Sequence, residues 1–319
     1  MGLDIRPLRA ADVPAALELS TQAGWNQLAA DWHRLLDIAP DGCVAGWVDD
    51  ELVATGTLVT YDDIGWIGMI LVDEDHRRNG YGTAVFERVR DLAEQRGVTA
   101  GLDATDAGRE VYRQVDFVDV APIQRWSGEL SPPTGTDGGP ARDPASAVET
   151  FDESDRDVRD AVCALDERCV GVDRSALLDH LLGEDGTTGL AVGAGEDGSA
   201  AGEGGRAAGE GGHATGEGGR ATGDDVRGYA LVRPGREHDH VGPIVAPSRD
   251  DAAALLAAAA EVAGERSVLV DLLDVDGSAS LLEAAGLECQ RRLTRMASRE
   301  PEPLLVGDGV VAAAGFELG

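Results

Sequence analysis

The sequence predicts an α+β fold: a mixed, mostly antiparallel sheet flanked by helices, formed twice in succession. Apolar runs of strand length alternate with amphipathic stretches of helix length in both halves of the chain. A Pro- and Gly-rich segment beginning at Ser131 separates the halves. Most aromatic residues precede that segment, whereas the apolar residues after it are mainly Ala, Leu and Val. We therefore predict domains at 1–130 and 146–319, joined by a linker at 131–145.

Hydrophobic periodicity locates the elements of the first domain. Asp12 is expected to cap the first helix, with Pro14 tolerated in its first turn. Asp49 and Asp50 are expected to turn a hairpin. The predicted elements are a strand at 3–8, helices at 12–22 and 28–37, strands at 43–48, 52–60 and 64–72, a helix at 83–95, a strand at 98–104, a helix at 107–115 and a strand at 117–126.

The second domain shows the same alternation, interrupted by one insertion of low complexity. Residues 193–225 are rich in Gly, Ala and Glu and contain almost no apolar side chain larger than Ala. Such a segment cannot bury enough apolar surface to order itself, so we expect it to be disordered. Around it we predict helices at 154–169 and 174–182, strands at 188–192, 226–232 and 240–245, a helix at 250–263, a strand at 268–273, a helix at 277–285 and a strand at 287–296.

Composition narrows the class of partner. The formal charge is −32, from 59 acidic against 27 basic residues, and every basic residue is Arg. A surface this negative repels polyanions, so nucleic acid and anionic membranes are not expected partners. The acid excess without Lys is typical of adaptation to high salt. With no signal-peptide pattern, no membrane-length apolar run and four Cys without metal-ligand spacing, we expect a cytoplasmic protein with reduced thiols and no metal.

The segment that follows the strand at 64–72 predicts a phosphate-binding loop. A short polar loop joins that strand to an amphipathic helix. Gly80 and Gly82 allow the backbone to approach an anion closely. The unpaired N–H groups of the first helical turn and the helix dipole both favour negative charge there. The residues expected to bind the anion are Arg77, Arg78, Asn79, Gly80, Tyr81, Gly82 and Thr83.

Two other patterns carry less information. Arg206, Gly209 and Gly211 repeat the R-x-x-G-x-G pattern inside the low-complexity insertion, without a strand before it or an amphipathic helix after it. We assign that match no phosphate. His238 and His240 lie on one face of a predicted strand, but two ligands without a third do not predict a metal site.

The first domain resembles the GCN5-related N-acetyltransferase (GNAT) family. The loop at Arg77–Thr83 matches the family's pyrophosphate segment, and the preceding strand ends in Ile70-Leu71-Val72. Residues 105–117 (TDAGREVYRQVDF) look like the family's helix that ends in Tyr-x-x-x-Gly-Phe. Two positions depart from the pattern: Asp116 replaces the usual Gly, and Thr105 stands where the family often has Asn. The resemblance implies direct transfer of an acetyl group from acetyl-CoA to a primary amine.

The whole chain looks like a tandem subgroup, sometimes called YitH-like, whose second half is a degenerate GNAT-like domain. The matching segments of the second half are 228–235, 241–245 and 281–287. No Arg-x-x-Gly-x-Gly follows Val245, and Pro247 removes one N–H that would face a phosphate. A second cofactor site is therefore a weaker expectation than the first.

The resemblance also implies catalytic roles. Tyr112 is the acid that protonates the CoA sulfur, because a phenol can donate a proton to a developing thiolate. A main-chain N–H of Leu71 or Val72 faces the developing oxyanion, and Thr105 contacts the cofactor. For the general base, Asp103 at the end of its strand is the candidate. The alternatives are a water chain or another carboxylate: Asp62, Asp63 or Glu74.

The acceptor pocket is expected between the first two helices, where this family usually shapes it. Trp25 is expected to form a wall and Asn26 to hydrogen-bond the substrate, although Trp25 also suits a plain core position. The expected acceptor is a small-molecule or peptide amine. The alternative function is a non-catalytic acyl-CoA-binding or regulatory module. The presence of Tyr112 together with the pyrophosphate loop favours the enzyme over this alternative. A Rossmann dinucleotide site is excluded because the loop does not open a first βαβ unit.

Overall fold

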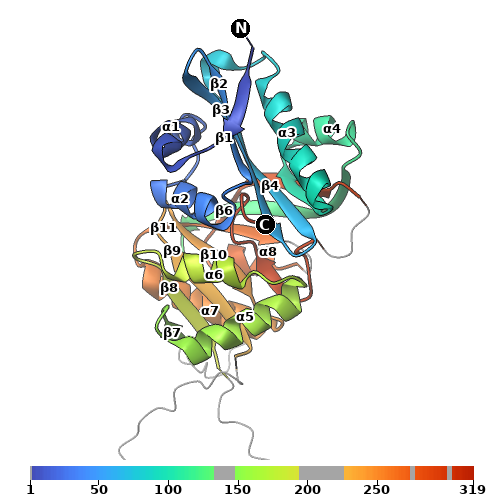
Figure 1. Cartoon of the computed structure of the whole chain (residues 1–319). Coiled ribbons are helices and arrows are strands. Elements are labelled where there is room, and N and C mark those ends of the chain that lie inside the picture. Colours follow the sequence, from blue (N-terminus) through green and yellow to red (C-terminus); the bar gives the residue numbers. More distant parts are fainter. Residues whose placement is uncertain (1, 133–147, 194–225, 274–276, 300–303) are drawn as a thin grey trace, which may run out of the picture.

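The computed structural model of the chain describes residues 2–132, 148–193, 226–273, 277–299 and 304–319 (Figure 1). The predicted linker falls almost entirely outside the described residues, and so do residues 194–225, which hold the predicted disordered insertion and the Arg206 match. No described helix is long and apolar enough to cross a bilayer.

The first half contains every predicted element. Asp12 directly precedes α1, but its carboxylate accepts from Arg9 N at 2.9 Å and does not cap the helix as predicted. Asp49 and Asp50 turn the β2–β3 hairpin with φ of 49° and 67°. The elements are β1 (Asp4–Pro7), η1 (Ala10–Asp12), α1 (Val13–Gln22), α2 (Ala29–Ile38), β2 (Cys43–Val48), β3 (Glu51–Tyr61), β4 (Ile64–Val72), η2 (Glu74–His76), α3 (Tyr81–Arg96), β5 (Thr99–Ala104), α4 (Asp106–Arg113) and β6 (Val118–Glu129).

The second half adds two strands that the sequence did not predict, β7 and β13. Both are short, with four and three residues, so their periodicity is weak. The elements are β7 (Val148–Phe151), α5 (Arg156–Val170), α6 (Ser175–Leu182), β8 (Thr188–Val192), β9 (Gly228–Arg233), β10 (Asp239–Val245), α7 (Arg249–Ala263), β11 (Ser267–Leu273), α8 (Ala279–Ala284), β12 (Glu288–Ala297) and β13 (Val310–Ala312).

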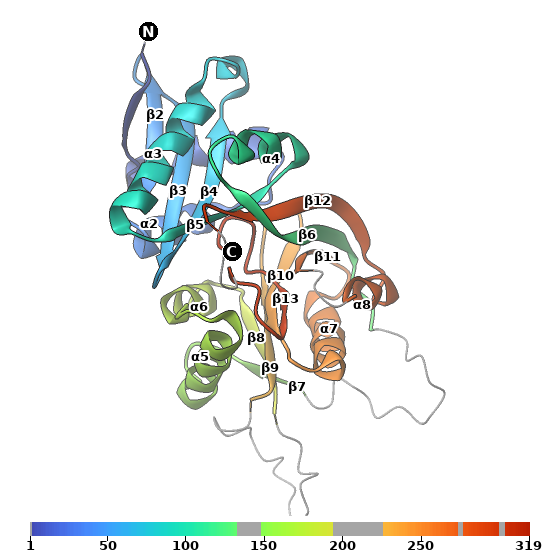
Figure 2. The ribbon, with the colours of Figure 1, turned by 90° about the vertical axis from the view of Figure 1, so that its right-hand side faces the viewer.

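The described strands form one mixed, mostly antiparallel sheet that runs through both halves. Their order is β1-β2-β3-β4-β5-β12-β6-β11-β13-β10-β9-β8-β7. Helices α1 and α2 cover one side of the first half and α3 and α4 the other (Figure 1). In the second half, α5 and α6 lie on one side and α7 and α8 on the other (Figure 2). The fold class is therefore the predicted α+β one, with two helix-flanked halves in tandem that share one continuous sheet.

Strand β12 crosses the boundary between the halves (Figure 2). It lies between β5 and β6 and is antiparallel to both, with Thr294 opposite Ala104 and Leu293 opposite Ile123. Strand β6 in turn pairs with the whole of β11, from Ile123 opposite Leu273 to Glu129 opposite Ser267. A strand from the second half of the chain thus completes the part of the sheet that the first half forms.

Each half contains a pair of parallel strands that separate after a short contact. Strands β4 and β5 pair only from Ile64–Thr99 to Trp66–Gly101. Strands β10 and β11 pair at Asp239–Val268 and His240–Leu269. Beyond those points the two backbones of each pair diverge. The gap that opens between them is called a notch below: the first lies between β4 and β5, and the second between β10 and β11.

One segment, residues 310–319, reaches both notches. Its first part is β13, which pairs with β10 on one side and β11 on the other and so fills the second notch. Its last part runs beside β4. Trp66 Nε1 donates to Phe316 O at 2.9 Å, and Tyr61 Oη donates to Leu318 O at 2.9 Å. A Cβ on Gly68 would lie 2.9 Å from Glu317 O, so this approach requires glycine there.

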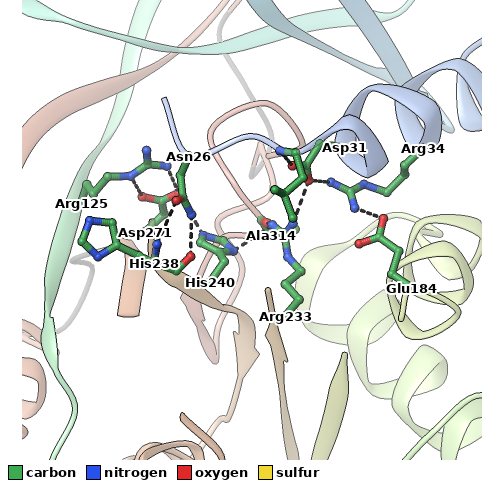
Figure 3. A network of polar contacts seen from close by, with 11 residues as sticks. Asn26, Asp31, Arg34, Arg125, Glu184, Arg233, His238, His240, Asp271 and Ala314 are labelled. Atoms are coloured by element: carbon green, nitrogen blue, oxygen red, sulfur yellow. Dashed lines mark hydrogen bonds and ion pairs between the residues drawn. The ribbon is translucent and has the colours of Figure 1, made fainter. Parts of the chain in front are cut away.

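Buried charges join the two halves (Figure 3). Arg34 of α2 pairs with Asp31 and with Glu184, which follows α6. Arg233 of β9 reaches Asp31 at 3.4 Å and also contacts Ala314 O. Because a buried charge is costly unless it is paired, this network fixes how the halves meet.

Candidate functional site

The predicted phosphate loop is formed as a strand, a glycine turn and a helix start. Gly80 adopts φ 81° directly before α3, which is a conformation that favours glycine. No side chain of the described residues caps this helix, so its first N–H groups are left for a ligand. At Gly82, a Cβ would lie 3.3 Å from Val72 Cγ2, so the turn packs closely on the end of β4.

The side chains of this loop divide into two groups. Arg77 and Arg78 are exposed and supply positive charge beside the helix terminus. Arg77 Nε lies 3.4 Å from Val72 O. Asn79 Nδ2 donates to His76 O at 3.0 Å, which fixes the turn itself. The predicted residues Tyr81, Gly82 and Thr83 form the first turn of α3. The structure therefore brings all seven predicted loop residues together.

A bulge in β4 decides which backbone groups face the notch. Thr55 pairs with Leu71 and Thr57 with Gly68, so one residue of β3 opposes two of β4. Within the bulge Met69 has φ 51°, and its carbonyl accepts a hydrogen bond from Thr55 Oγ1 at 2.9 Å.

One cavity of about 210 Å³ occupies the notch between β4 and β5. Residues from both halves line it. They are Trp25 and Gln27 before α2; Ile67, Gly68, Met69 and Ile70 of β4; Leu102, Asp103 and Ala104 of β5; Thr105, Gly108 and Tyr112 at α4; Arg125 of β6; Arg291 and Leu293 of β12; and Phe316 and Glu317. Met69 and Ile70, and not the predicted Leu71 or Val72, line this cavity, because the bulge shifts the register.

Tyr112 lies at the α4 end of the cavity. Its ring packs against Phe86 and Phe117, with centroids 4.8 and 6.1 Å away. Burial raises the pKa of the Tyr112 phenol, which keeps it protonated. Asp116 adopts φ 67°, so it takes the left-handed conformation that the usual glycine would provide. The aromatic packing and this turn together fix the position of Tyr112.

Thr105 begins α4. Its Oγ1 accepts a hydrogen bond from Gly108 N at 3.2 Å, so it caps the helix. It also lines the cavity, next to Gly108 and Tyr112. Thr105 therefore positions the helix that carries Tyr112.

Asp103 is held in an ion pair rather than left free. Arg295 of β12 donates to both carboxylate oxygens, at 3.0 and 3.1 Å, and both side chains are fully buried. Burial raises the pKa of Asp103, and the Arg295 guanidinium opposes that rise. This pairing favours a structural role over the predicted role of general base, because the carboxylate is committed to the adjacent strand.

Of the two predicted acceptor residues, only Trp25 lines the cavity. Asn26 instead joins the halves: its Nδ2 donates to His238 O at 2.8 Å, and its Oδ1 accepts from Glu237 N at 2.8 Å and His238 N at 3.1 Å (Figure 3). These contacts use the side chain that was expected to bind substrate. The next residue, Gln27, is buried and lines the cavity.

The sequence did not identify the contribution of the last segment. Phe316 and Glu317 line the cavity although they follow Asp103 by more than two hundred positions. Arg125, which also lines the cavity, lies over Phe316 with its guanidinium carbon 4.1 Å from the ring centroid, and it donates two hydrogen bonds to Asp271 at 2.6 and 2.7 Å. A lone Phe-Glu pair in a short Val/Ala/Gly-rich segment has no pattern that indicates a site.

The corresponding notch of the second half is filled by β13, so its backbone groups pair with β13. His238 and His240 are not metal ligands of one another: His238 Nδ1 contacts Ser267 Oγ at 2.9 Å, while His240 lies between Arg233 and Asp271. Among the described residues no group of three or more His, Cys, Asp or Glu side chains is placed to hold a metal.

A separated β4–β5 pair, a glycine turn before α3 and a tyrosine-bearing α4 define a GNAT-type acyl-CoA fold. Family models agree: the "Acetyltransferase (GNAT) family" model matches residues 13–117, and an "Acetyltransferase (GNAT) domain" model matches residues 217–306. The chain therefore belongs to the GNAT family and carries two GNAT domains in tandem.

Individual relatives are distant. The chain is 27% identical over 173 residues to the holothin acyltransferase of a Pseudoalteromonas species, which is 54% of either chain. It thus spans about half the length of that relative. A putative acetyltransferase from Pyrococcus horikoshii superposes with a TM-score of 0.75 at 21% identity, over 100% of this chain and 96% of that one. A tandem GNAT protein from the clavulanic acid biosynthesis pathway superposes with a TM-score of 0.58 at 17% identity, over 94% and 100%.

Proposed function

We propose that the first domain is an N-acyltransferase that moves the acetyl group of acetyl-CoA to a primary amine of a small molecule or peptide. The observation that carries this proposal is the cavity itself. It lies between the β4 bulge, the end of β5 and Tyr112. The loop that follows β4 leads into an uncapped helix start with two exposed arginines. The likeness to GNAT models and to a holothin acyltransferase supports acyl transfer as the reaction class.

Each part of the site has one task in this reaction. The loop at 77–83 binds the pyrophosphate through helix N–H groups and arginine charge. The main chain of the β4 bulge, at Ile70, donates a hydrogen bond to the oxyanion that forms when the amine attacks the thioester. Tyr112 then donates its proton to the departing thiolate. The cavity volume suits a short acyl group.

The second domain has a supporting role in this proposal. Strand β13 occupies the notch between β10 and β11, and the cavity of about 320 Å³ beside it, at the end of β10 and the start of α7, has no tyrosine in its lining. The contribution of the second domain is to supply β12 and the segment that lines the first-domain cavity.

Calorimetry with acetyl-CoA, followed by a thiol-release assay against a library of amines, tests the proposal. We expect one bound acetyl-CoA per chain and thiol release with a subset of the amines. A series of acetyl-, butyryl- and octanoyl-CoA should show a preference for the shortest chain. Tight binding with no thiol release for any amine would support a non-catalytic acyl-CoA-binding module instead, and no binding would overturn the proposal.

A further inference from the structure

Two polar side chains lie together at one end of the first-domain cavity. Gln27 and Glu317, together with the Arg125 guanidinium, line this cavity and also the small cavity beside it, which Asp31, Arg233 and His240 line from the second half and α2. Residues shared by two cavities lie on their common wall. Tyr112 lines only the first cavity. The cavity therefore has an α4 end with Tyr112 and an interdomain end with Gln27 and Glu317.

Gln27 presents an unused hydrogen-bond acceptor at the interdomain end. The residue is 8% exposed, and its Oε1 has no hydrogen-bond partner among the described residues. A buried acceptor left unpaired costs free energy, so its retention points to a donor that arrives with a ligand.

Glu317 supplies a carboxylate at the same place. The residue is 6% exposed, and its side chain folds back over Gly315, where a Cβ would lie 2.8 Å from Oε1. Burial raises the pKa of Glu317; the charge of Asp31 acts in the same direction, whereas Arg233 and Arg34 oppose it. A carboxylate whose pKa moves toward neutrality is suited to exchange protons with an amine.

We propose that Glu317, together with Gln27, forms the acceptor subsite of the first domain and that Glu317 takes the proton from the acceptor ammonium. This inference rests on the proposed acyl transfer. A residue of the second domain thereby acts on a substrate of the first. The sequence candidate Asp103 is tied to Arg295, which leaves Glu317 as the cavity carboxylate outside that ion pair.

The proton balance closes with these two groups. The ammonium gives one proton to Glu317, and the neutral nitrogen forms a bond to the thioester carbon. The C–S bond then breaks, and the thiolate takes a proton from Tyr112. The second proton lost by the nitrogen restores Tyr112 through water, and Glu317 releases its proton to bulk water. One amide, one free thiol and one proton result from each ammonium and thioester.

The walls of the subsite define the chemical class of the acceptor. Trp25 and Phe316 are aromatic, and the Phe316 ring is held by the Arg125 guanidinium. A carboxylate and an amide acceptor between aromatic walls fit a cationic primary amine on a flat, apolar body. Benzylamine carries these features and serves as the probe. Aniline has the same ring but an amino group that is uncharged at neutral pH, so it needs no base before it attacks.

The test compares Glu317→Gln with wild-type protein on both probes. With benzylamine we expect kcat/KM to fall on the order of 10²–10⁴-fold, the usual effect of losing a positioned base. With aniline, turnover should change no more than about threefold. Glu184→Gln makes the same chemical change in the interdomain network but outside this cavity, and it should leave both activities unchanged. Gln27→Leu should raise the KM for benzylamine roughly 5- to 10-fold, the effect of one lost hydrogen bond.

Three results would overturn the assignment. An equal loss on both probes would make Glu317 structural, and an undiminished rate with benzylamine would remove it from the reaction. Turnover of aniline but not benzylamine by the wild-type protein would exclude the cationic class. Failure of the proposed function itself shows separately, as an absence of acetyl-CoA binding to the wild-type protein. Melting temperatures of the variants, with Glu317→Asp as a carboxylate-preserving partner, confirm that each compared protein is folded.

Discussion

Asp103 of β5 and Arg295 of β12 form a fully buried, two-pronged ion pair between the halves of the chain, with N–O distances of 3.0 and 3.1 Å. Arg295 also donates to Leu305 O at 3.2 Å, and its guanidinium carbon lies 4.4 Å from the Trp66 ring centroid. The pair thus connects the notch between β4 and β5 to the strand that completes the first sheet.

Removing one member of this pair should be much worse than removing both. Asp103→Leu leaves the Arg295 charge buried and unpaired, which should lower the free energy of unfolding by about 3–5 kcal/mol. The double variant Asp103→Leu with Arg295→Met should recover most of that loss. Urea unfolding of the three proteins measures this. If Asp103 were the general base, the double variant would fold but release no thiol; we expect it to remain active.

Gly82→Asp should abolish CoA binding and leave the fold intact. The new carboxylate lies at a helix start that is predicted to hold pyrophosphate, and its side chain blocks the approach of the backbone. Calorimetry with CoA measures the loss. Gly82→Asn has nearly the same shape without the charge and should retain part of the affinity. Unchanged affinity in Gly82→Asp would remove the phosphate from this loop.

Tyr112→Phe should lower kcat on the order of 10²–10⁴-fold with little change in the KM for acetyl-CoA. The ring packing on Phe86 does not depend on the hydroxyl, so the fold should be unaffected. Tyr229→Phe is the matched control. It removes a buried hydroxyl that contacts Asp166 in the second half and should change stability rather than kcat. Full turnover in Tyr112→Phe would mean that Tyr112 serves only packing.

His240 should make stability depend on pH in the mildly acidic range. Burial, with the charge of Arg233 beside it, lowers the pKa of His240 to about 4. Arg233 Nη2 can only donate, so His240 Nδ1 accepts at 2.8 Å and the ring is neutral with its proton on Nε2.

The unfolded chain binds a proton at this histidine near pH 6.5, whereas the folded protein does not until about pH 4. The stability due to neutral His240 is therefore complete above pH 6.5 and falls as the pH drops toward 4. His240→Gln should show a shallower loss over that window in denaturant titrations at several pH values. Parallel curves for the two proteins would contradict the assignment.

Deleting residues 194–224 and closing the gap with a short turn should leave activity and melting temperature nearly unchanged. Strands β8 and β9 pair on their own, with Val192 opposite Gly228, so the ends to be joined already lie side by side. A shorter loop also lowers the entropy of closure, by roughly 1 kcal/mol. The test measures turnover and melting temperature of both proteins at low and at molar KCl. A loss of solubility or turnover only at molar salt would assign the segment a role in solvation or docking.

Local patterns explain how much of the fold the sequence predicts. The strand Ile64–Val72 and the glycine turn at Gly80 are set by their own residues, so periodicity and turn chemistry locate them. The partners of β12 are not locally encoded. Thr294 pairs with Ala104, which lies far from it in the sequence. Alternation of apolar and polar residues predicts which face of a strand is buried, but it does not predict which strand lies beside it.

The site shows the same division. The loop at 77–83 was predictable because its chemistry lies in consecutive residues. Asn26 was expected in the acceptor pocket, but its amide matches the backbone groups of a turn more than two hundred positions away. Glu317 reaches the cavity only because Gly68 lets its backbone lie against β4. Such contacts depend on tertiary packing, which single-sequence patterns do not carry.

The position of β12 also constrains how this gene can change. A shortened gene that encodes only the first half would leave β5 and β6 without the strand between them, and each would present an unpaired edge prone to aggregation. The first half is therefore not expected to fold stably without residues 288–297. Residues 288–297 complete the sheet beside the cavity, although the loop before α3 lies some two hundred positions earlier in the chain.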